Sequence, residues 1–137
     1  MKLSLENLEK KVNWQGYRLP DYDIQAMREK TRENPTWLHF GAGNIFRAFP
    51  AVLVQRMLTA GLTDKGIICC EGYDEEIIDR AYRPFDNLSL CVTLYADGAL
   101  KKEVVGSIAE SLKLSVDSDR VAEIFCNPSL QMVSFTI

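Results

Sequence analysis

Residues 37–48 read WLHFGAGNIFRA, an apolar run that leads directly into two closely spaced glycines. The run predicts a strand over 36–40, and Gly41 permits a tight turn at the end of that strand. Gly43 leaves the backbone open to close approach by a pyrophosphate, and a helix behind the turn offers free N–H groups to an anion. The stretch therefore predicts a strand–turn–helix unit that binds a nucleotide.

The match to the dinucleotide fingerprint G-x-G-x-x-G is incomplete, because Phe46 stands where the third glycine would be. A bare G-x-G also occurs in ordinary turns. The third glycine serves close packing of helix on strand, so its absence predicts a helix set further from the sheet. Pro50 also favours a helix that starts late after the turn, since proline suits the first position of a helix and breaks a helix interior. We expect an extended loop over 41–48, then a helix that starts near Phe49 and is closed by Gly61.

A second strand is expected over 66–70, apolar on both faces as a buried parallel strand should be, and it ends at Glu71. Glu71 lies 25 positions after Phe46, close to the roughly 20 typical of an acid that accepts hydrogen bonds from the adenosine ribose. Its charge, with that of Asp74 and the two glutamates after it, would repel a 2′-phosphate, so the expected cofactor is NAD rather than NADP. Asp74 is the alternative ribose acceptor, and a solvated acidic helix start is the alternative to both.

Asn44 and Arg47 lie in the expected loop and can face the same crevice as the glycines. Arg47 can pair with a phosphate oxygen, and Asn44 can donate to one or tolerate an unusual backbone angle. A solvent-exposed arginine at a helix start fits the pattern equally well. His39 stands alone on its strand beside Trp37 and Phe40, and we expect a hydrogen-bonded core histidine rather than a catalyst.

The first part of the chain predicts a helical N-terminal extension made of two short helices. Ser4 can cap the first helix, which carries Val12 on its apolar side. Asp21 or Asp23 can cap the second helix, and Asn34-Pro35 ends it.

The remaining chain alternates helices and strands, which is the order of an α/β layer fold. Its expected elements are a helix over 74–82, a hairpin over 88–108 with an Asp-Gly turn, a helix over 117–125 and a strand over 130–137. The predicted fold class is α/β, with the helical extension over 1–35 and part of a Rossmann-like dinucleotide-binding domain over 36–137. That domain is expected to hold a largely parallel sheet and a β-hairpin insertion.

Composition excludes several other classes of protein. The formal charge of −3 and the pI near 5.2 give no general attraction to nucleic acid or to an anionic membrane. No stretch approaches the roughly 18 uncharged residues of a spanning helix, and charged residues interrupt any N-terminal run that could serve as a signal peptide. The four cysteines show no C-x-x-C spacing and predict free, buried thiols in a reducing cytoplasm, namely Cys69, Cys70, Cys91 and Cys126.

Residues 37–48 also resemble the glycine-rich signature of the mannitol dehydrogenase family, the polyol-specific long-chain dehydrogenases that include fructuronate and tagaturonate reductases. The resemblance extends to EGYD at 71–74 and to NPSLQMVSFTI at 127–137, although Phe49 stands where many members have histidine. It implies an NAD(P)-dependent oxidoreductase that interconverts a polyol or aldonate with a ketose or keto-uronate. It also implies cofactor binding by the loop and the acid after the second strand, that is by Gly41, Ala42, Gly43, Asn44, Ile45, Phe46, Arg47 and Glu71.

The family carries its catalytic lysine and histidine in a helical C-terminal domain, and no segment of this chain matches that domain. The resemblance therefore implies the N-terminal portion of a longer enzyme, without catalytic residues of its own. The full-length enzyme would take a small sugar or polyol as substrate. In the last strand Val133, Phe135 and Ile137 alternate with Ser134 and Thr136, and an unpaired edge of this kind predicts self-association.

Two other functions fit parts of the pattern. An S-adenosylmethionine-dependent methyltransferase would also use Gly41, Gly43 and Glu71, but His39-Phe40 stand just before the turn, where an acid is expected. A non-catalytic nucleotide-binding module is the second alternative, because the chain holds no credible acid–base pair.

Overall fold

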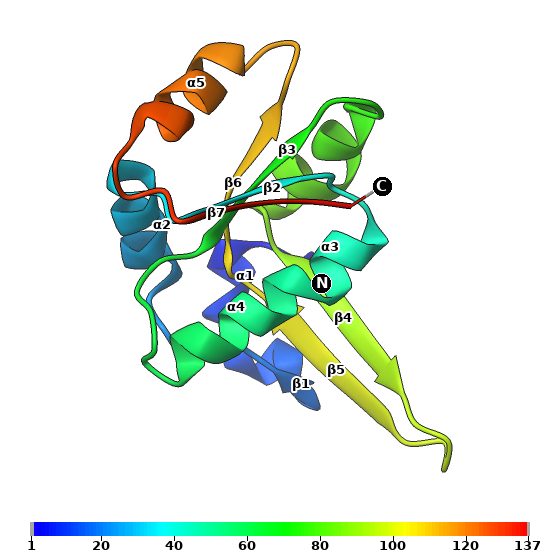
Figure 1. Ribbon diagram of the computed structural model, residues 1–137. Helices are drawn as coiled ribbons and strands as arrows, with labels where there is room; N and C mark the ends of the chain where they lie inside the picture. The colour runs from blue at the N-terminus through cyan, green and yellow to red at the C-terminus, as the bar shows by residue number, and fades with distance from the viewer. Residues whose placement is uncertain (1, 137) are drawn as a thin grey trace.

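Four short, mostly apolar runs pair into a parallel sheet in the computed structural model, which describes residues 2–136 (Figure 1). The strand order is β6-β3-β2-β7, with β2 (Trp37–Phe40), β3 (Ile67–Glu71), β6 (Ile108–Lys113) and β7 (Met132–Phe135). The chain moves outward from β2 to β6 and then returns to pair β7 with the other side of β2. The winding direction therefore reverses between β2 and β7, which is where open α/β sheets bind their ligands.

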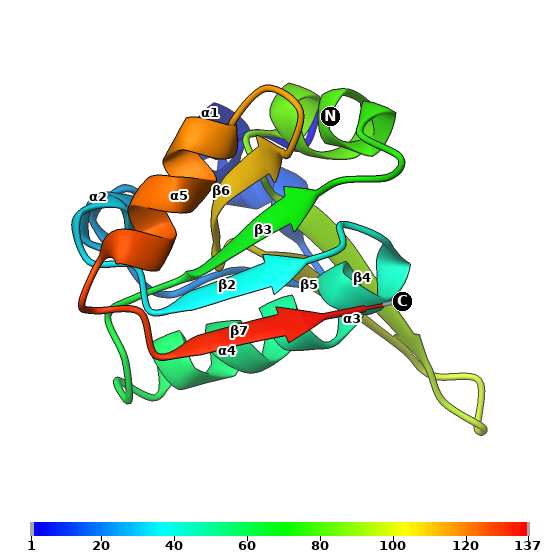
Figure 2. The same cartoon turned by 45° about the horizontal axis from the view of Figure 1, so that its top comes forward.

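Helices cover both faces of this sheet (Figures 1 and 2). The short α3 (Asn44–Ala48) and the longer α4 (Pro50–Thr59) lie on one face, and α5 (Ser118–Cys126) lies on the other beside α2 (Ile24–Glu33). The residues of β3 from Ile67 to Cys70 are fully buried, as a central parallel strand covered on both faces requires. The Rossmann-like α/β fold predicted from the sequence is confirmed.

A smaller sheet lies beside the main one. β4 (Ser89–Leu94) and β5 (Leu100–Val105) form the predicted antiparallel hairpin, and Gly98 adopts φ +85° in its turn. β1 (Tyr17–Arg18) pairs parallel with β5. The N-terminal segment is thereby fixed to the hairpin.

The N-terminal extension is less regular than the sequence predicts. It holds α1 (Leu5–Leu8), capped by Ser4, then the 3₁₀ turn η1 (Lys11–Trp14) and β1. Because α1 stops at Leu8, Val12 does not continue its apolar side and is 73% exposed. The second helix, α2, forms as predicted, with Asp23 accepting a hydrogen bond from the Ala26 N–H at 2.9 Å.

The expected extended loop over 41–48 is wrong in its second half, because Asn44–Ala48 form the helical turn α3. Phe46 supplies the reason, since its side chain is fully buried and stacks on His39 with ring centroids 4.8 Å apart. A large ring thus fills the space that a third fingerprint glycine would leave for closer packing. The next helix, predicted to start near Phe49, begins at Pro50.

The strand β6 is a second departure from the predicted elements. The hairpin was expected to continue to Ile108, whereas Gly106 and Ser107 separate β5 from β6. β6 contains Glu110, which is only 8% exposed and forms an ion pair with Arg120 at 3.1 Å. A paired, buried carboxylate interrupts the apolar pattern by which such a strand would be recognised.

The other predicted elements form with small shifts. Residues 76–82 are helical, with Ile78–Tyr82 (η2) in π-helical geometry, and η3 (Arg83–Phe85) follows as a 3₁₀ turn. Helix α5 and strand β7 lie where the sequence predicts them, although the prediction for Ile137 falls outside the described residues. All four thiols are free, but only Cys69 and Cys70 are buried, whereas Cys91 is half-buried and Cys126 is exposed. Within the described residues, no helix combines the length and the apolar character needed to cross a bilayer.

Candidate functional site

A cavity of about 550 Å³ opens at the carboxyl ends of β2 and β7, where the strand order reverses. Its wall joins the turn after β2 to the ends of β3 and β7, and comprises Gly41, Ala42, Gly43, Asn44, Ile45, Glu71, Tyr73 and Thr136. Six of the eight residues predicted to bind a cofactor thus lie around one cavity. Its position is the one that open parallel sheets offer to nucleotides.

The two glycines of the turn have different surroundings. Gly41 adopts φ +114°, and a Cβ there would lie 2.3 Å from Thr136 Oγ1. Gly43 has φ −78°, which any residue can adopt, and a Cβ there would meet no atom within 4 Å. The fold itself therefore requires Gly41, whereas the space beside Gly43 is open and can admit a ligand.

Glu71 connects the glycine turn to the end of β3. Its Oε2 accepts a hydrogen bond from the Ala42 N–H at 2.9 Å, and its Oε1 accepts from the Gly72 and Tyr73 N–H groups at 3.0 Å each. Backbone donors thus orient the carboxylate at the cavity wall. Each carboxylate oxygen can accept more than one hydrogen bond, so Glu71 can also accept from a ligand hydroxyl.

Phe46 and Arg47 support the turn from behind instead of lining the cavity. The Arg47 guanidinium donates to Asn44 Oδ1 at 2.5 Å and lies over the Tyr82 ring, 5.5 Å from its centroid. The Tyr82 hydroxyl donates to the Ala42 carbonyl at 2.7 Å. These contacts fix the conformation of the turn. They engage the Arg47 guanidinium that the sequence suggested for phosphate binding, whereas Asn44 takes part through its acceptor Oδ1 and not through its donor Nδ2.

Two residues of the cavity wall were not singled out from the sequence. Tyr73 is 98% exposed at the rim, two positions after Glu71. Thr136 follows β7, and its backbone N–H donates to the Phe40 carbonyl at 3.0 Å. For Tyr73 the available signal was its position just after a parallel strand, because the carboxyl ends of such strands meet at one edge. Thr136 carried no such signal, since it falls inside the strand predicted over 130–137. Asp74, the alternative to Glu71, is not part of the wall and pairs with Arg80 at 3.6 Å.

His39 is the buried, hydrogen-bonded histidine that the sequence predicts. It is 2% exposed, its Nδ1 lies 2.7 Å from Ser134 Oγ and its Nε2 lies 3.1 Å from Thr136 Oγ1. Burial lowers the pKa of His39 below its usual value, because the charged ring would lose its hydration. The ring is therefore neutral at pH 7.

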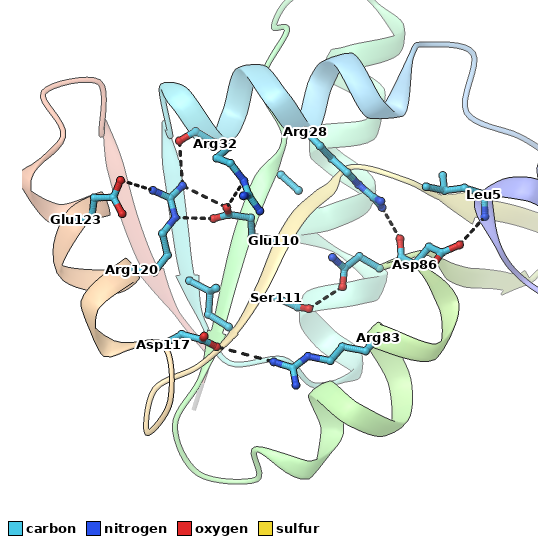
Figure 3. A pocket seen from close by; sticks show the side chains of 13 residues that line it. Leu5, Arg28, Arg32, Arg83, Asp86, Glu110, Ser111, Asp117, Arg120 and Glu123 are labelled. Carbon is cyan, nitrogen blue, oxygen red and sulfur yellow. Dashed lines mark hydrogen bonds and ion pairs between the residues drawn. The ribbon is translucent and has the colours of Figure 1, made fainter.

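A larger cavity, of about 640 Å³, lies at the outer edge of the sheet along β6 (Figure 3). The Glu110 carboxylate forms ion pairs with Arg32 at 3.3 Å and with Arg120 at 3.1 Å. The Arg28 guanidinium donates a hydrogen bond to the Asp86 carbonyl at 2.5 Å. These arginines thus have acidic or carbonyl partners, although the buried Nε of Arg28 has no hydrogen-bond partner among the described residues. We interpret this cavity as an ion-pair network that holds α2 and α5 against β6.

The sheet order, the glycine turn and the cavity between β2 and β7 define the chain as a Rossmann-like domain. No family model matches it. A D-mannonate oxidoreductase of Thermotoga maritima is 43% identical over 142 residues, which cover 100% of this chain and 26% of the relative. A polyol:NADP oxidoreductase of Gluconobacter oxydans is 27% identical over 124 residues, which cover 86% of this chain and 24% of the relative.

A solved structure shows the same fold. The mannitol 2-dehydrogenase of Pseudomonas fluorescens, in a ternary complex with NAD and D-mannitol, superimposes with a TM-score of 0.84 at 22% identity, covering 100% of this chain and 27% of that chain. The solved structure shows the fold, and the curated relatives confirm the resemblance to the mannitol dehydrogenase family. The chain spans about a quarter of the length of the curated relatives it matches.

Proposed function

We propose that this chain is the cofactor-binding portion of an NAD(P)-dependent oxidoreductase that interconverts a polyol or aldonate with a ketose or keto-uronate. The observation that carries the proposal is the cavity at the reversal of strand order, lined by the glycine turn and Glu71. Its occurrence in a chain 43% identical to a D-mannonate oxidoreductase supports this chemistry. The methyltransferase alternative finds no support among these relatives.

The open space beside Gly43 fits a pyrophosphate, because the backbone there carries no side chain that would keep a ligand away. In this proposal Gly41 to Ile45 surround the pyrophosphate and Glu71 accepts hydrogen bonds from the adenosine ribose. When bound, the nicotinamide supplies or accepts the hydride. Phe46 and Arg47 act indirectly by holding the turn in place.

NAD is the proposed cofactor, since the Glu71 carboxylate would lie against the 2′-phosphate of NADP and repel it. No acidic residue other than Glu71 lines the cavity, and three backbone donors already engage its carboxylate. The group that exchanges a proton with the substrate is therefore proposed to come from the part of the enzyme that this chain does not span. This chain would bind and orient the cofactor.

Calorimetric titration of the chain with NADH and with S-adenosylmethionine tests the proposal. We expect NADH to bind and S-adenosylmethionine not to bind. Binding of S-adenosylmethionine alone would support the methyltransferase, and binding of neither would contradict a nucleotide site. In parallel, we expect the chain alone to give no NADH oxidation with fructuronate, tagaturonate or fructose. Turnover by the purified chain would show that it holds a catalytic acid.

A further inference from the structure

Hydrogen bonds between β2 and β7 connect the interior of the sheet to the cavity. The Trp37 indole N–H donates to Ser134 Oγ at 2.7 Å, and the same oxygen lies 2.7 Å from His39 Nδ1. On the other side of the imidazole, His39 Nε2 lies 3.1 Å from Thr136 Oγ1. The parallel register, with His39 opposite Ser134, places alternate residues of both strands on one face. These four side chains form a row that ends in the cavity wall.

The chemistry of these groups allows two arrangements of the protons in the row, one for each tautomer of neutral His39. The indole can only donate, so Ser134 Oγ accepts from it and has one hydroxyl proton left to donate. In the first arrangement that proton goes to His39 Nδ1. In the second, His39 Nδ1 donates to Ser134 Oγ, and the Ser134 proton has no acceptor in the row. A neutral imidazole that accepts at Nδ1 carries its proton at Nε2, which then donates to Thr136 Oγ1.

In the first arrangement, Thr136 keeps a hydroxyl proton that has no acceptor in the row, and this is the arrangement that a ligand in the cavity would favour by accepting that proton. Its side chain lies in the cavity wall and occupies the space that a side chain at Gly41 would need. Within the sheet, β7 and β3 flank β2 on opposite sides, so Thr136 and Glu71 face the cavity from opposite sides. If the adenosine ribose lies at Glu71, the other half of a dinucleotide extends toward Thr136.

We propose that Thr136 donates its hydroxyl proton to an oxygen on the nicotinamide-side half of the bound dinucleotide. His39 and Ser134 are positioning residues, because they hold Thr136 Oγ1 as an acceptor from the protein and so direct its proton to the ligand. Trp37 completes the row by occupying Ser134 Oγ as a donor. The inference rests on the proposed function, since it requires a dinucleotide in this cavity.

The test compares NADH, which extends across both halves of the cavity, with AMP, which represents the adenosine half alone. Thr136→Val removes the hydroxyl with little change of shape, and Thr136→Ser restores it. We expect Thr136→Val to weaken NADH binding about 3- to 10-fold, the effect of one lost hydrogen bond, and to leave AMP binding unchanged. Thr136→Ser should bind NADH within about 2-fold of the unmodified chain.

Ser134→Ala examines the positioning role at a residue that does not reach the cavity. Without the Ser134 proton, His39 can carry its proton at Nδ1, and Nε2 then accepts from Thr136 and withdraws the donor from the ligand. We expect a selective loss of NADH affinity with AMP binding retained. A merely structural role would weaken both ligands together. Thr93→Val is the control for Thr136→Val, because it makes the same exchange at an exposed position on β4, outside the cavity wall.

Unchanged NADH affinity in a folded Thr136→Val variant would overturn the role of Thr136. Equal losses for NADH and AMP in Ser134→Ala would overturn the positioning role. If the unmodified chain bound neither ligand, the proposed function would fail first and this inference with it. AMP binding without NADH binding would retain the adenosine half of the site and contradict the contact at Thr136.

Discussion

Gly41 and Gly43 stand two positions apart in the same turn, but their neighbours give them different roles. Gly41 combines a positive φ with the Thr136 side chain directly against it, so any larger residue would strain the fold. Gly43 has ordinary backbone angles and open space, so the fold alone does not demand glycine there. A substitution at Gly43 can therefore separate binding from stability.

Gly43→Val is expected to abolish measurable NADH binding while the chain stays folded, because the branched side chain fills the space proposed for the pyrophosphate. Calorimetry with NADH measures the affinity, and thermal unfolding measures the stability of the same samples. Thr93→Val is the control, since it places a valine at an exposed site on β4, outside the cavity wall. Unchanged NADH affinity in the folded Gly43→Val variant would contradict the phosphate site.

Glu71→Ser is expected to narrow the preference for NAD over NADP by about 1–3 kcal/mol, the scale of a lost charged hydrogen bond or of a local repulsion. Affinities of the intact enzyme for NADH and NADPH give the ratio. Because Glu71 also accepts from the Ala42 N–H, some NADH affinity should be lost as the turn loosens. Asp74→Asn is the control, because Asp74 pairs with Arg80 outside the cavity wall. If the ratio changed only in that control, the role would belong to Asp74.

The sequence predicts those helices and strands that carry a local signal, such as an apolar run, a capping residue or a proline at a helix start. β3 is recognisable because it is apolar on both faces, and α2 and α4 are recognisable from an Asp23 cap and from Pro50 at a helix start. Helix α3 was missed because five residues are too short for a periodic signal, and because Phe46 is held by packing on His39. Its formation depends on a contact that the local sequence does not specify.

The candidate site also contains residues that the local sequence indicates and residues that only tertiary contacts bring to the site. The sequence indicated the turn and Glu71, which neighbour one another through parallel strand pairing. It did not indicate that Phe46 and Arg47 would lie behind the turn, because their orientation follows from α3. It also gave no reason to select Thr136, which comes beside Gly41 only when β7 pairs with β2. The placement of Phe46, Arg47 and Thr136 is thus a consequence of tertiary structure.

The ion pairs along β6 can be tested at this scale. Glu110 is 8% exposed and lies between Arg120 and Arg32, so its removal takes from the partly buried Arg120 its buried partner and leaves it only the exposed Glu123, at 3.2 Å. We expect Glu110→Ala to lower the free energy of unfolding by about 2 kcal/mol, and Arg32→Ala, at an exposed side chain, by less than about 1 kcal/mol. Urea denaturation measures both. Equal decreases in the free energy of unfolding for the two variants would show that the burial of Glu110 does not determine how much these ion pairs stabilise the fold.

Among the described strands, β7 forms one edge of the main sheet, next to β2. Phe135 on this edge is 66% exposed. Self-association through β7 remains a prediction, because an unpaired strand offers its backbone groups to a second copy. Sedimentation of the chain should show dimers or larger species that diminish in Phe135→Lys. Equal sedimentation of that variant and the unmodified chain would show that this edge does not pair.

The stability of the whole chain should decrease as the pH falls below 7. Burial lowers the pKa of His39, so between its folded value and the usual value near 6.5 the unfolded chain binds more protons than the folded chain. The pKa of Asp79 is also lowered, by its hydrogen bond to Lys113, and its contribution is lost at more acidic pH. His39 therefore dominates the change just below about pH 6.5, where one proton accounts for a slope of at most about 1.4 kcal/mol per pH unit.

His39→Gln isolates that contribution, because the amide can still donate and accept between Ser134 and Thr136 but does not titrate. Urea denaturation at a series of pH values should show a clear decrease in stability between pH 6.5 and 5 for the unmodified chain. The variant should stay nearly constant over this interval. Both should then lose stability below about pH 4.5, where the paired carboxylates become protonated. Parallel curves above pH 5 would mean that folding does not lower the pKa of His39.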